Sequence, residues 1–168
     1  MPTPVNVTQD GLRQAVAGLL EGGGAHVTLE DALSGLEPEW RTHRPPGLHS
    51  VWQLLAHLRI VQEDLLRYTL DPTWISPDWP DETWPENPSD LPEALWQETL
   101  AAYRRDLSEL VALAQNPAYT LTDELPHGEG RTYLRQLLLA ADHAAYHVGQ
   151  IVSLRRARGD WPPQGTPL

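Results

Sequence analysis

The chain has 168 residues but no cysteine and no phenylalanine, and each absence excludes something. Without cysteine there is no disulfide bond, no thiolate metal ligand and no cysteine nucleophile. Any metal site must therefore use nitrogen and oxygen atoms. Without phenylalanine, the large aromatic side chains are seven tryptophans and five tyrosines, whose polar ends favour the margins of cores and pockets.

Positive charge is also scarce, because the formal net charge of the chain is −11. Proteins that bind nucleic acids need a basic surface to displace the counterions of the phosphates. The basic cluster of Arg155, Arg156 and Arg158 stands in the last turn of an expected helix, where cations offset the negative end of the helix dipole. We therefore expect no nucleic-acid partner.

Long apolar runs are absent, and none approaches the roughly 20 residues that a membrane-spanning helix needs. The opening stretch, MPTPVNVTQDGLRQ, lacks the basic and then apolar pattern of a secretory signal. We expect a cytoplasmic protein that does not enter a membrane. With 40% apolar residues, the chain should form one globular domain over 1–168, with loose tails at 1–7 and 160–168.

Apolar residues recur with the helical period in five segments. Cap residues and helix breakers place these helices at about 9–20, 28–36, 51–70, 91–115 and 131–159. The expected N-caps are Thr8, Thr28, Ser50, and either Ser89 or Asp90. On the fourth helix the expected buried positions are Leu95, Leu100, Tyr103, Leu107, Leu110 and Val111. The sequence therefore predicts an all-α fold, a four-helix bundle with one short additional helix.

The segment 71–90 holds five prolines and three tryptophans, Trp74, Trp79 and Trp84, and it has no periodic pattern. Loops of this length are uncommon in compact domains and often act as lids or binding loops. Two interpretations stay open. The indoles either seal the core beside the helix 51–70 or form the wall of a pocket over a metal site.

Two histidines, His143 and His147, stand four residues apart, so they share one helix face about one turn apart. Two neutral imidazoles in this arrangement can bind one divalent ion, although such pairs also occur without a metal. A third histidine, His57, lies at or beside the buried side of the helix 51–70, where an unpaired polar ring is costly. Three histidines from two packed helices are enough to hold a metal with open positions.

Other polar residues lie near these faces. Gln136 and Gln150 share the face of the histidine pair and can orient an imidazole or hold a water. Asp64 shares the face of His57 and is a candidate acceptor for its ring or a weak fourth ligand, but the favoured interpretation is a solvated acid. His127, between turn residues, is expected at the surface.

The stretches PPGLHSVWQLLAH and DHAAYHVGQIVSLRR together resemble the DinB-like (DinB/YfiT) superfamily of small metal-binding four-helix bundles, over about 25–159. The resemblance implies that His57, His143 and His147 bind a divalent ion, often nickel or zinc, with water in the open positions. It also implies frequent homodimers. Parts of the family carry out transfers and isomerisations that depend on mycothiol, bacillithiol or glutathione, while many members have no assigned activity.

Three neutral ligands would leave such an ion its full charge, so a coordinated thiol or water would lose its proton near neutral pH. The first hypothesis is therefore an enzyme that transfers a low-molecular-weight thiol to a small-molecule electrophile. The residues do not identify a general base. The alternatives are a metal-dependent hydrolase, a non-catalytic bundle that binds a metal or ligand, and a bundle whose histidines are buried without a metal.

Overall fold

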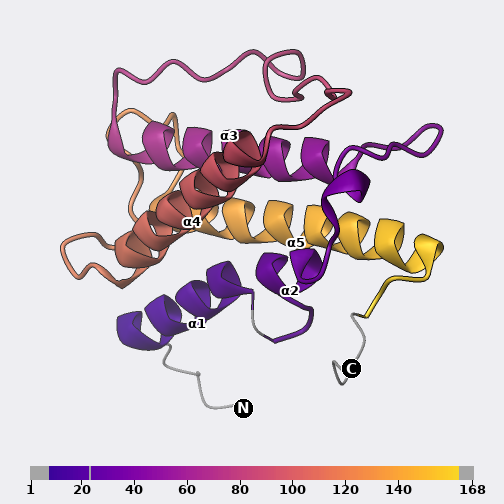
Figure 1. The fold of residues 1–168 in the computed structure, drawn as a ribbon. Coiled ribbons are helices and arrows are strands. Elements are labelled where there is room, and N and C mark those ends of the chain that lie inside the picture. The colour runs from indigo at the N-terminus through magenta and orange to yellow at the C-terminus, as the bar shows by residue number, and fades with distance from the viewer. Residues whose placement is uncertain (1–7, 23, 163–168) are drawn as a thin grey trace.

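The computed structural model describes residues 8–22 and 24–162, so the expected loose tail at 1–7 and most of that at 160–168 lie outside the described residues. The elements in chain order are α1 (Gln9–Glu21), α2 (Leu29–Leu33), the 3₁₀ helix η1 (Pro38–Trp40), α3 (Val51–Leu70), α4 (Glu93–Gln115) and α5 (Tyr133–Arg158) (Figure 1). The described part contains no strand, only an isolated bridge between Glu124 and Thr132. The all-α prediction is confirmed.

Side-chain caps determine where the first long helices begin. The Thr8 hydroxyl accepts a hydrogen bond from the backbone N–H of Gly11. At the start of α3, the Ser50 hydroxyl accepts from the N–H of Gln53 while the Gln53 side chain accepts from the N–H of Ser50. Thr28 forms the same reciprocal capping box at the start of α2. These three predicted caps are confirmed.

The expected start of the fourth helix is wrong. Helix α4 begins at Glu93, directly after Pro92, and no side chain caps it. Because a proline disfavours helical backbone in the residue before it, Leu91 stays outside the helix and neither Ser89 nor Asp90 can cap it. Helix α5 also begins later than expected, at Tyr133, because the Thr132 hydroxyl accepts a hydrogen bond from the N–H of Arg135.

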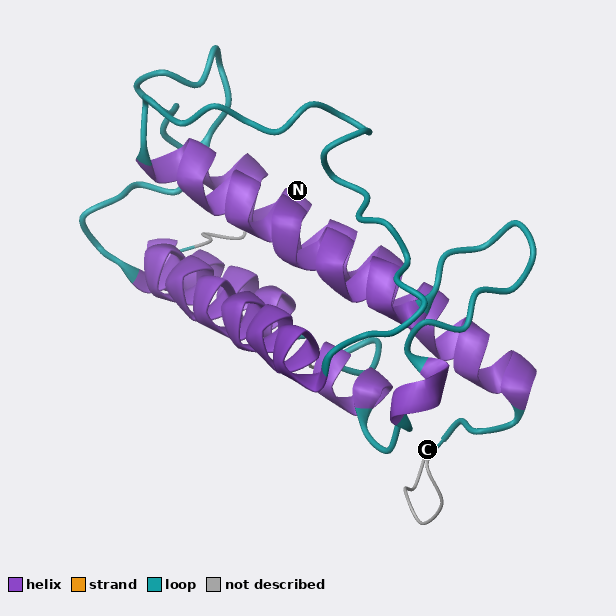
Figure 2. Ribbon diagram, turned by 45° about the horizontal axis from the view of Figure 1, so that its top comes forward, coloured by secondary structure: helices purple, strands orange, loops and turns teal. Residues whose placement is uncertain are grey.

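Four long helices pack as a bundle in which α3 and α1 each lie against both α4 and α5, while α2 lies against α5 (Figure 2). One apolar cluster joins α2, the first half of α3, the first half of α4 and the second half of α5. A second joins α1 to the second half of α3, the end of α4 and the first half of α5. On α4, the expected burial of Leu95 is wrong, since this residue is 40% exposed and Trp96 beside it is buried. The larger indole fills the core position, and the Arg41 guanidinium lies over it.

One of the three arginines at the end of α5 is not a surface charge. Arg155 is 1% exposed and donates hydrogen bonds to the carbonyl oxygens of Ala32, Ser34 and Asp160. The last carbonyls of a helix have no partner within the helix, so this buried guanidinium satisfies the end of α2 and ties it to α5. The prediction that Arg155 offsets the dipole of its own helix is therefore incomplete, because its hydrogen bonds also reach the end of α2.

The segment 71–92 leads from the end of α3 to the start of α4 and runs back along α3 (Figure 1). Three contacts define its direction. Near the end of α3, the Trp74 indole donates a hydrogen bond to the Asp64 carboxylate. Near its start, the Gln53 side chain donates to the Pro85 carbonyl and the Trp52 indole donates to the Glu86 carbonyl. The segment is therefore antiparallel to α3 and covers its outer side. Among the described residues, no helix is both long and apolar enough to cross a membrane.

Candidate metal centre

Three imidazoles meet between α3 and α5. The Nε2 atom of His143 lies 3.1 Å from the Nε2 atom of His57 and 3.1 Å from that of His147. One ligand atom of each ring lies within 4.8 Å of the other two, so the three can hold one metal ion. His57 is fully buried, His147 is 5% exposed and His143 is half-buried. The structure thus brings the three predicted histidines together, and their binding of a metal stays a prediction.

The orientation of His57 is set by the segment that covers α3. Its Nδ1 atom lies 2.8 Å from the backbone carbonyl oxygen of Thr83. Because a carbonyl only accepts hydrogen bonds, Nδ1 carries the proton and donates it. The Nε2 atom is then left with a lone pair that is directed at the other two histidines. A hydrogen bond of this kind is the usual means by which a protein orients a metal-binding imidazole.

Asp64 does not have the role that its helical position suggests. Its carboxylate accepts a hydrogen bond of 2.8 Å from the Trp74 indole, and it lies outside the group of metal-binding candidates. The predictions of a ring acceptor for His57 and of a weak fourth ligand are therefore wrong. The favoured interpretation, a solvated acid, is also incomplete, because Asp64 is half-buried beneath the covering segment.

The ring of His147 is oriented from its own helix. Its Nδ1 atom lies 2.8 Å from the Oε1 atom of Gln150, one turn further along α5, so it donates a proton there and leaves its Nε2 lone pair free. Gln150 thus orients an imidazole, as expected. Gln136 does not, because its side-chain oxygen is buried and accepts a hydrogen bond from the Arg135 guanidinium.

The arrangement fits a cation better than it fits protons. The lone pairs of His57 and His147 both face Nε2 of His143, which can present at most one proton and thus satisfy one of them. A divalent cation satisfies all three nitrogens together. Nitrogens bound at about 2.0–2.1 Å to one ion lie roughly 2.9 Å apart at a right angle and roughly 3.4 Å apart at the tetrahedral angle. The observed separations of 3.1 Å fall between these limits.

Burial also favours the neutral form of the rings. Removal from water lowers the pKa of His57 to about 4, against the opposing effect of the Thr83 carbonyl. Burial, followed by the neighbouring imidazoles, lowers the pKa of His143 to about 4 as well. The pKa of His147 is lowered, again mainly by burial. The cluster therefore presents neutral imidazoles at physiological pH, the form that binds a metal.

Aromatic rings close one side of the cluster. The Trp84 indole lies between two imidazoles, with its ring centroid 3.8 Å from that of His57 and 3.8 Å from that of His49. Trp84 also packs against the apolar cluster around α3. Trp79 reaches within 5.7 Å of the His57 ring and is 67% exposed. The first interpretation is confirmed for Trp84, which seals the core beside α3. Trp84 also covers the ring of His57, but that the indoles form the wall of a pocket over a metal stays a prediction.

Sequence reasoning missed several of these contacts. The Thr83 carbonyl and the stacking of Trp84 have no local signal, because both depend on how an aperiodic segment lies on α3. The sequence gives no role to His49 beyond its place in the PPGLHS stretch. The expected surface position of His127 is wrong, since its Nε2 atom lies 2.6 Å from the Tyr68 carbonyl near the end of α3 and the residue is half-buried.

Comparison with known proteins agrees with this geometry. The family model of the DinB superfamily matches residues 25–151, more than half of the chain. The matched region contains the three clustered histidines and the segment that covers His57. No curated protein and no solved structure matches the chain significantly. The chain belongs to the DinB superfamily.

Proposed function

We propose that the protein is a divalent-metal-dependent enzyme that transfers a low-molecular-weight thiol to a small electrophilic substrate. The observation that supports this most strongly is the convergence of three Nε2 lone pairs in a group that, among the described residues, includes no carboxylate. Structural zinc sites usually close with four protein ligands, whereas catalytic sites keep a position open. An all-nitrogen donor set suits Ni²⁺ and Zn²⁺, the ions we expect.

The chemistry of the proposal divides between the ion and the chain. A divalent cation held by three neutral imidazoles keeps its full charge and lowers the pKa of a thiol or water that binds it. The chain supplies the orientation, since Thr83 and Gln150 hold the Nδ1 protons of His57 and His147 and keep their Nε2 atoms free. Trp84 excludes water from the covered face of His57.

In the transfer, the thiol sulfur forms a bond to the electrophilic carbon, the leaving group departs with its electron pair, and the thiol proton is released to solvent. We assign no general base, because the histidines that face the centre are all occupied as candidate ligands.

Hydrolysis is the second candidate. It is favoured by the half-buried position of His143, which lets water reach the cluster. A homodimer, a cytoplasmic location and one domain over 1–168 remain predictions.

Spectroscopy of the Ni²⁺-loaded protein tests the proposal. Glutathione, mycothiol and bacillithiol are titrated separately, and consumption of thiol is then followed with 1-chloro-2,4-dinitrobenzene as the electrophile. We expect at least one thiol to change the Ni²⁺ spectrum and to be consumed faster with loaded protein than in the uncatalysed reaction or with metal-free protein. The variant His147→Ala should lose both effects, whereas His26→Ala, which removes an exposed histidine, should keep them.

Each of the other outcomes has a definite meaning. If no thiol changes the spectrum and none is consumed, the transferase proposal is wrong. Release of acid from an uncharged ester by loaded protein without any thiol would identify the hydrolase instead. A spectrum that responds to neither thiol nor ester would leave a non-catalytic bundle.

A further inference from the structure

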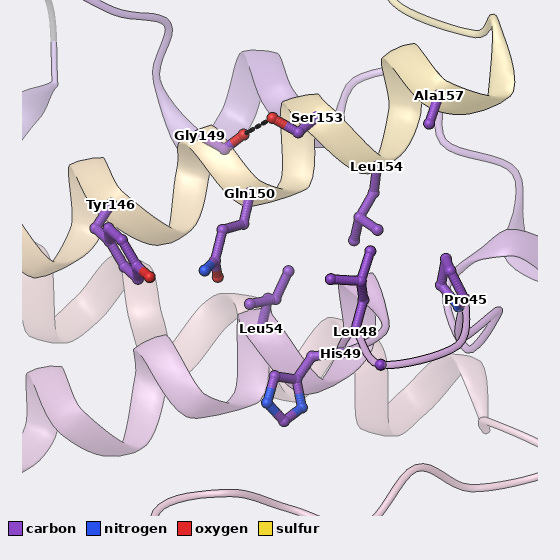
Figure 3. A pocket seen from close by; sticks show the side chains of 11 residues that line it. Pro45, Leu48, His49, Leu54, Tyr146, Gly149, Gln150, Ser153, Leu154 and Ala157 are labelled. Atoms are coloured by element: carbon purple, nitrogen blue, oxygen red, sulfur yellow. Dashed lines mark hydrogen bonds between the residues drawn. The ribbon is translucent and has the colours of Figure 1, made fainter.

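A cavity of about 620 Å³ lies between the second half of α5 and the stretch that leads into α3. Cavities of roughly 300–1,000 Å³ are the usual size for small-molecule sites. Figure 3 shows Gln150 and Leu154 reaching from α5 toward Leu48 and Leu54 on the facing side. We call this cavity the α5 groove. Its size alone suits a ligand with one or two rings.

The α5 groove borders the histidine cluster at three points. Gln150 lines the groove and accepts the Nδ1 proton of His147. The ring of Tyr146, also in the lining, lies 5.0 Å from that of His147. His49 lines the groove and stacks on Trp84, which stacks on His57 in turn. A ligand in the groove is therefore separated from His147 by single side chains and from His57 by two.

The lining is polarised along the groove. Tyr146, His49 and Gln150 gather at one end, while Leu154 and Ala157 stand toward the other (Figure 3). The Nδ1 atom of His49 is buried and has no hydrogen-bond partner among the described residues, so the polar atoms that face a ligand at this end come from Tyr146 and Gln150. The groove thus matches a molecule with an apolar body and a polar or reactive end directed toward the cluster.

Among the described residues, the lining of the groove has no acidic side chain and no arginine, so it does not favour ionic ligands. The chain contains no lysine, and its net charge is −11. A carboxylate or phosphate in the groove would lose water without gaining a counter-charge, which is costly. An acidic thiol such as glutathione is therefore a poor occupant, and an uncharged molecule is a good one.

We propose that the α5 groove binds the electrophilic substrate, and that this substrate is an uncharged, largely apolar small molecule. The assignment of the ligand as substrate rests on the proposed function, but the binding of an uncharged apolar molecule does not. The groove therefore selects an electrophile that carries no charge, while the metal that the histidine cluster would hold binds the thiol.

The test uses Gly149, which lines the groove from α5. A Cβ atom added there meets nothing within 4 Å, so Gly149→Leu adds bulk to the wall of the groove without a backbone clash and also favours the helix. The matched control is Gly18→Leu on α1, where an added Cβ likewise meets nothing within 4 Å. The probes are N-phenyl-1-naphthylamine, which is uncharged, and 1-anilinonaphthalene-8-sulfonate, the same skeleton with a negative charge.

We expect the uncharged probe to bind the wild type in a saturable manner, with the sulfonate weaker by on the order of tenfold. The variant Gly149→Leu should lose on the order of tenfold in affinity for the uncharged probe, while Gly18→Leu matches the wild type. In turnover, Gly149→Leu should raise the KM for 1-chloro-2,4-dinitrobenzene and keep its metal. Absence of probe binding, equal binding by the two variants, or equal binding of the two probes would overturn the proposal.

Probe binding needs neither a thiol nor turnover, so it separates the two proposals. If the probes behave as expected but no thiol is consumed, the groove stands and the proposed function fails. If thiol transfer occurs with an unchanged KM in Gly149→Leu, the electrophile binds elsewhere and the inference fails alone.

Discussion

The indole of Trp84 lies flat on the imidazole of His57, with ring centroids 3.8 Å apart and planes within 4° of parallel. The two residues are brought together by a segment without helix or strand, whose Thr83 carbonyl also holds the Nδ1 atom of the same imidazole. One candidate ligand is therefore fixed from two directions by a neighbouring stretch of chain. The tryptophan-rich segment is a part of the histidine site and not a separate surface loop.

Replacement of the stacked indole tests this coupling. In Trp84→Ala, His57 loses its stacking partner and the segment that carries Thr83 is loosened, so we expect metal affinity to fall by about 10–100-fold. Isothermal titration with Zn²⁺ measures the change. The control is Trp74→Ala in the same segment, which removes the contact with Asp64 and should leave metal affinity close to the wild type. Equal losses in the two variants would contradict a specific role for Trp84.

The two glutamines of α5 give a sharper comparison, because they differ in whether they touch a histidine. In Gln150→Leu the Nδ1 proton of His147 loses its acceptor, and we expect metal affinity to fall by about 10–100-fold. Gln136 accepts from Arg135 instead, so Gln136→Leu should bind metal as tightly as the wild type. The same Zn²⁺ titration reports both. A loss in Gln136→Leu that equals the loss in Gln150→Leu would count against the proposed orientation of His147.

The metal-free protein should lose stability as the pH falls through the titration range of its histidines. The pKa values of His57 and His143 are about 4 in the folded protein, below the ordinary value of 6.5, so the unfolded chain takes up protons first. The free energy of unfolding should therefore decrease from pH 6.5 down to about 4, by roughly 1 kcal/mol per pH unit for each ring, and level off below.

Urea denaturation at several pH values, in the presence of a chelator, measures this slope. Acidic residues titrate in part of the same range, so the informative quantity is the difference between the wild type and His143→Asn, which lacks one of the two rings. We expect a smaller slope in the variant. Parallel curves would show that His143 does not resist protonation in the folded protein.

A buried acid on α4 provides an independent test of the packing between α3 and α4. Asp106 is fully buried, and neither of its carboxylate oxygens has a hydrogen-bond partner among the described residues. Burial raises its pKa, because the charged form loses water. The ionised carboxylate therefore costs stability as the pH rises from its unfolded pKa through its folded one, and Asp106→Asn removes this cost.

We expect Asp106→Asn to raise the free energy of unfolding at pH 7 by about 1–2 kcal/mol, with the gain disappearing in acid, where Asp106 is protonated. Urea denaturation at both pH values measures it. The control, Glu98→Gln, removes an equal charge from an exposed position of the same helix and should change stability by less than about 0.5 kcal/mol. A destabilised Asp106→Asn at pH 7 would mean that the ion pair with Arg105, whose Nε atom lies 3.6 Å from Oδ1 of Asp106, outweighs the cost of burial.

The parts of this molecule that sequence predicts well are those governed by local geometry. The spacing of His143 and His147 guarantees a shared helix face, and the hydroxyls of Thr8, Thr28 and Ser50 cap helices through contacts within a few residues. The meeting of His57 with the pair followed from helices long enough to pack side by side. For the histidine pair and the caps the physical cause lies within one helix. For His57 it lies in the apolar sides along which α3 and α5 pack.

The features that sequence reasoning missed depend on contacts between distant residues. Thr83 lies 26 residues from His57 and meets it through a backbone carbonyl, a group that every residue possesses. Arg155 looks like a surface charge at the end of α5 until the open carbonyls of α2 are placed beside it. Asp64 shared the helix face of His57, but the Trp74 indole was the nearer partner. A helix face predicts neighbours on that helix and not the loop that covers it.

The central claim, that His57, His143 and His147 hold one divalent ion, is tested most directly by the metal content of protein purified without a histidine tag. Elemental analysis should find about one nickel or zinc ion per chain in the wild type and in His26→Ala, and large losses in His57→Ala and His147→Ala. Equal metal content in all four proteins, or none in the wild type after incubation with Ni²⁺ or Zn²⁺, would contradict the account.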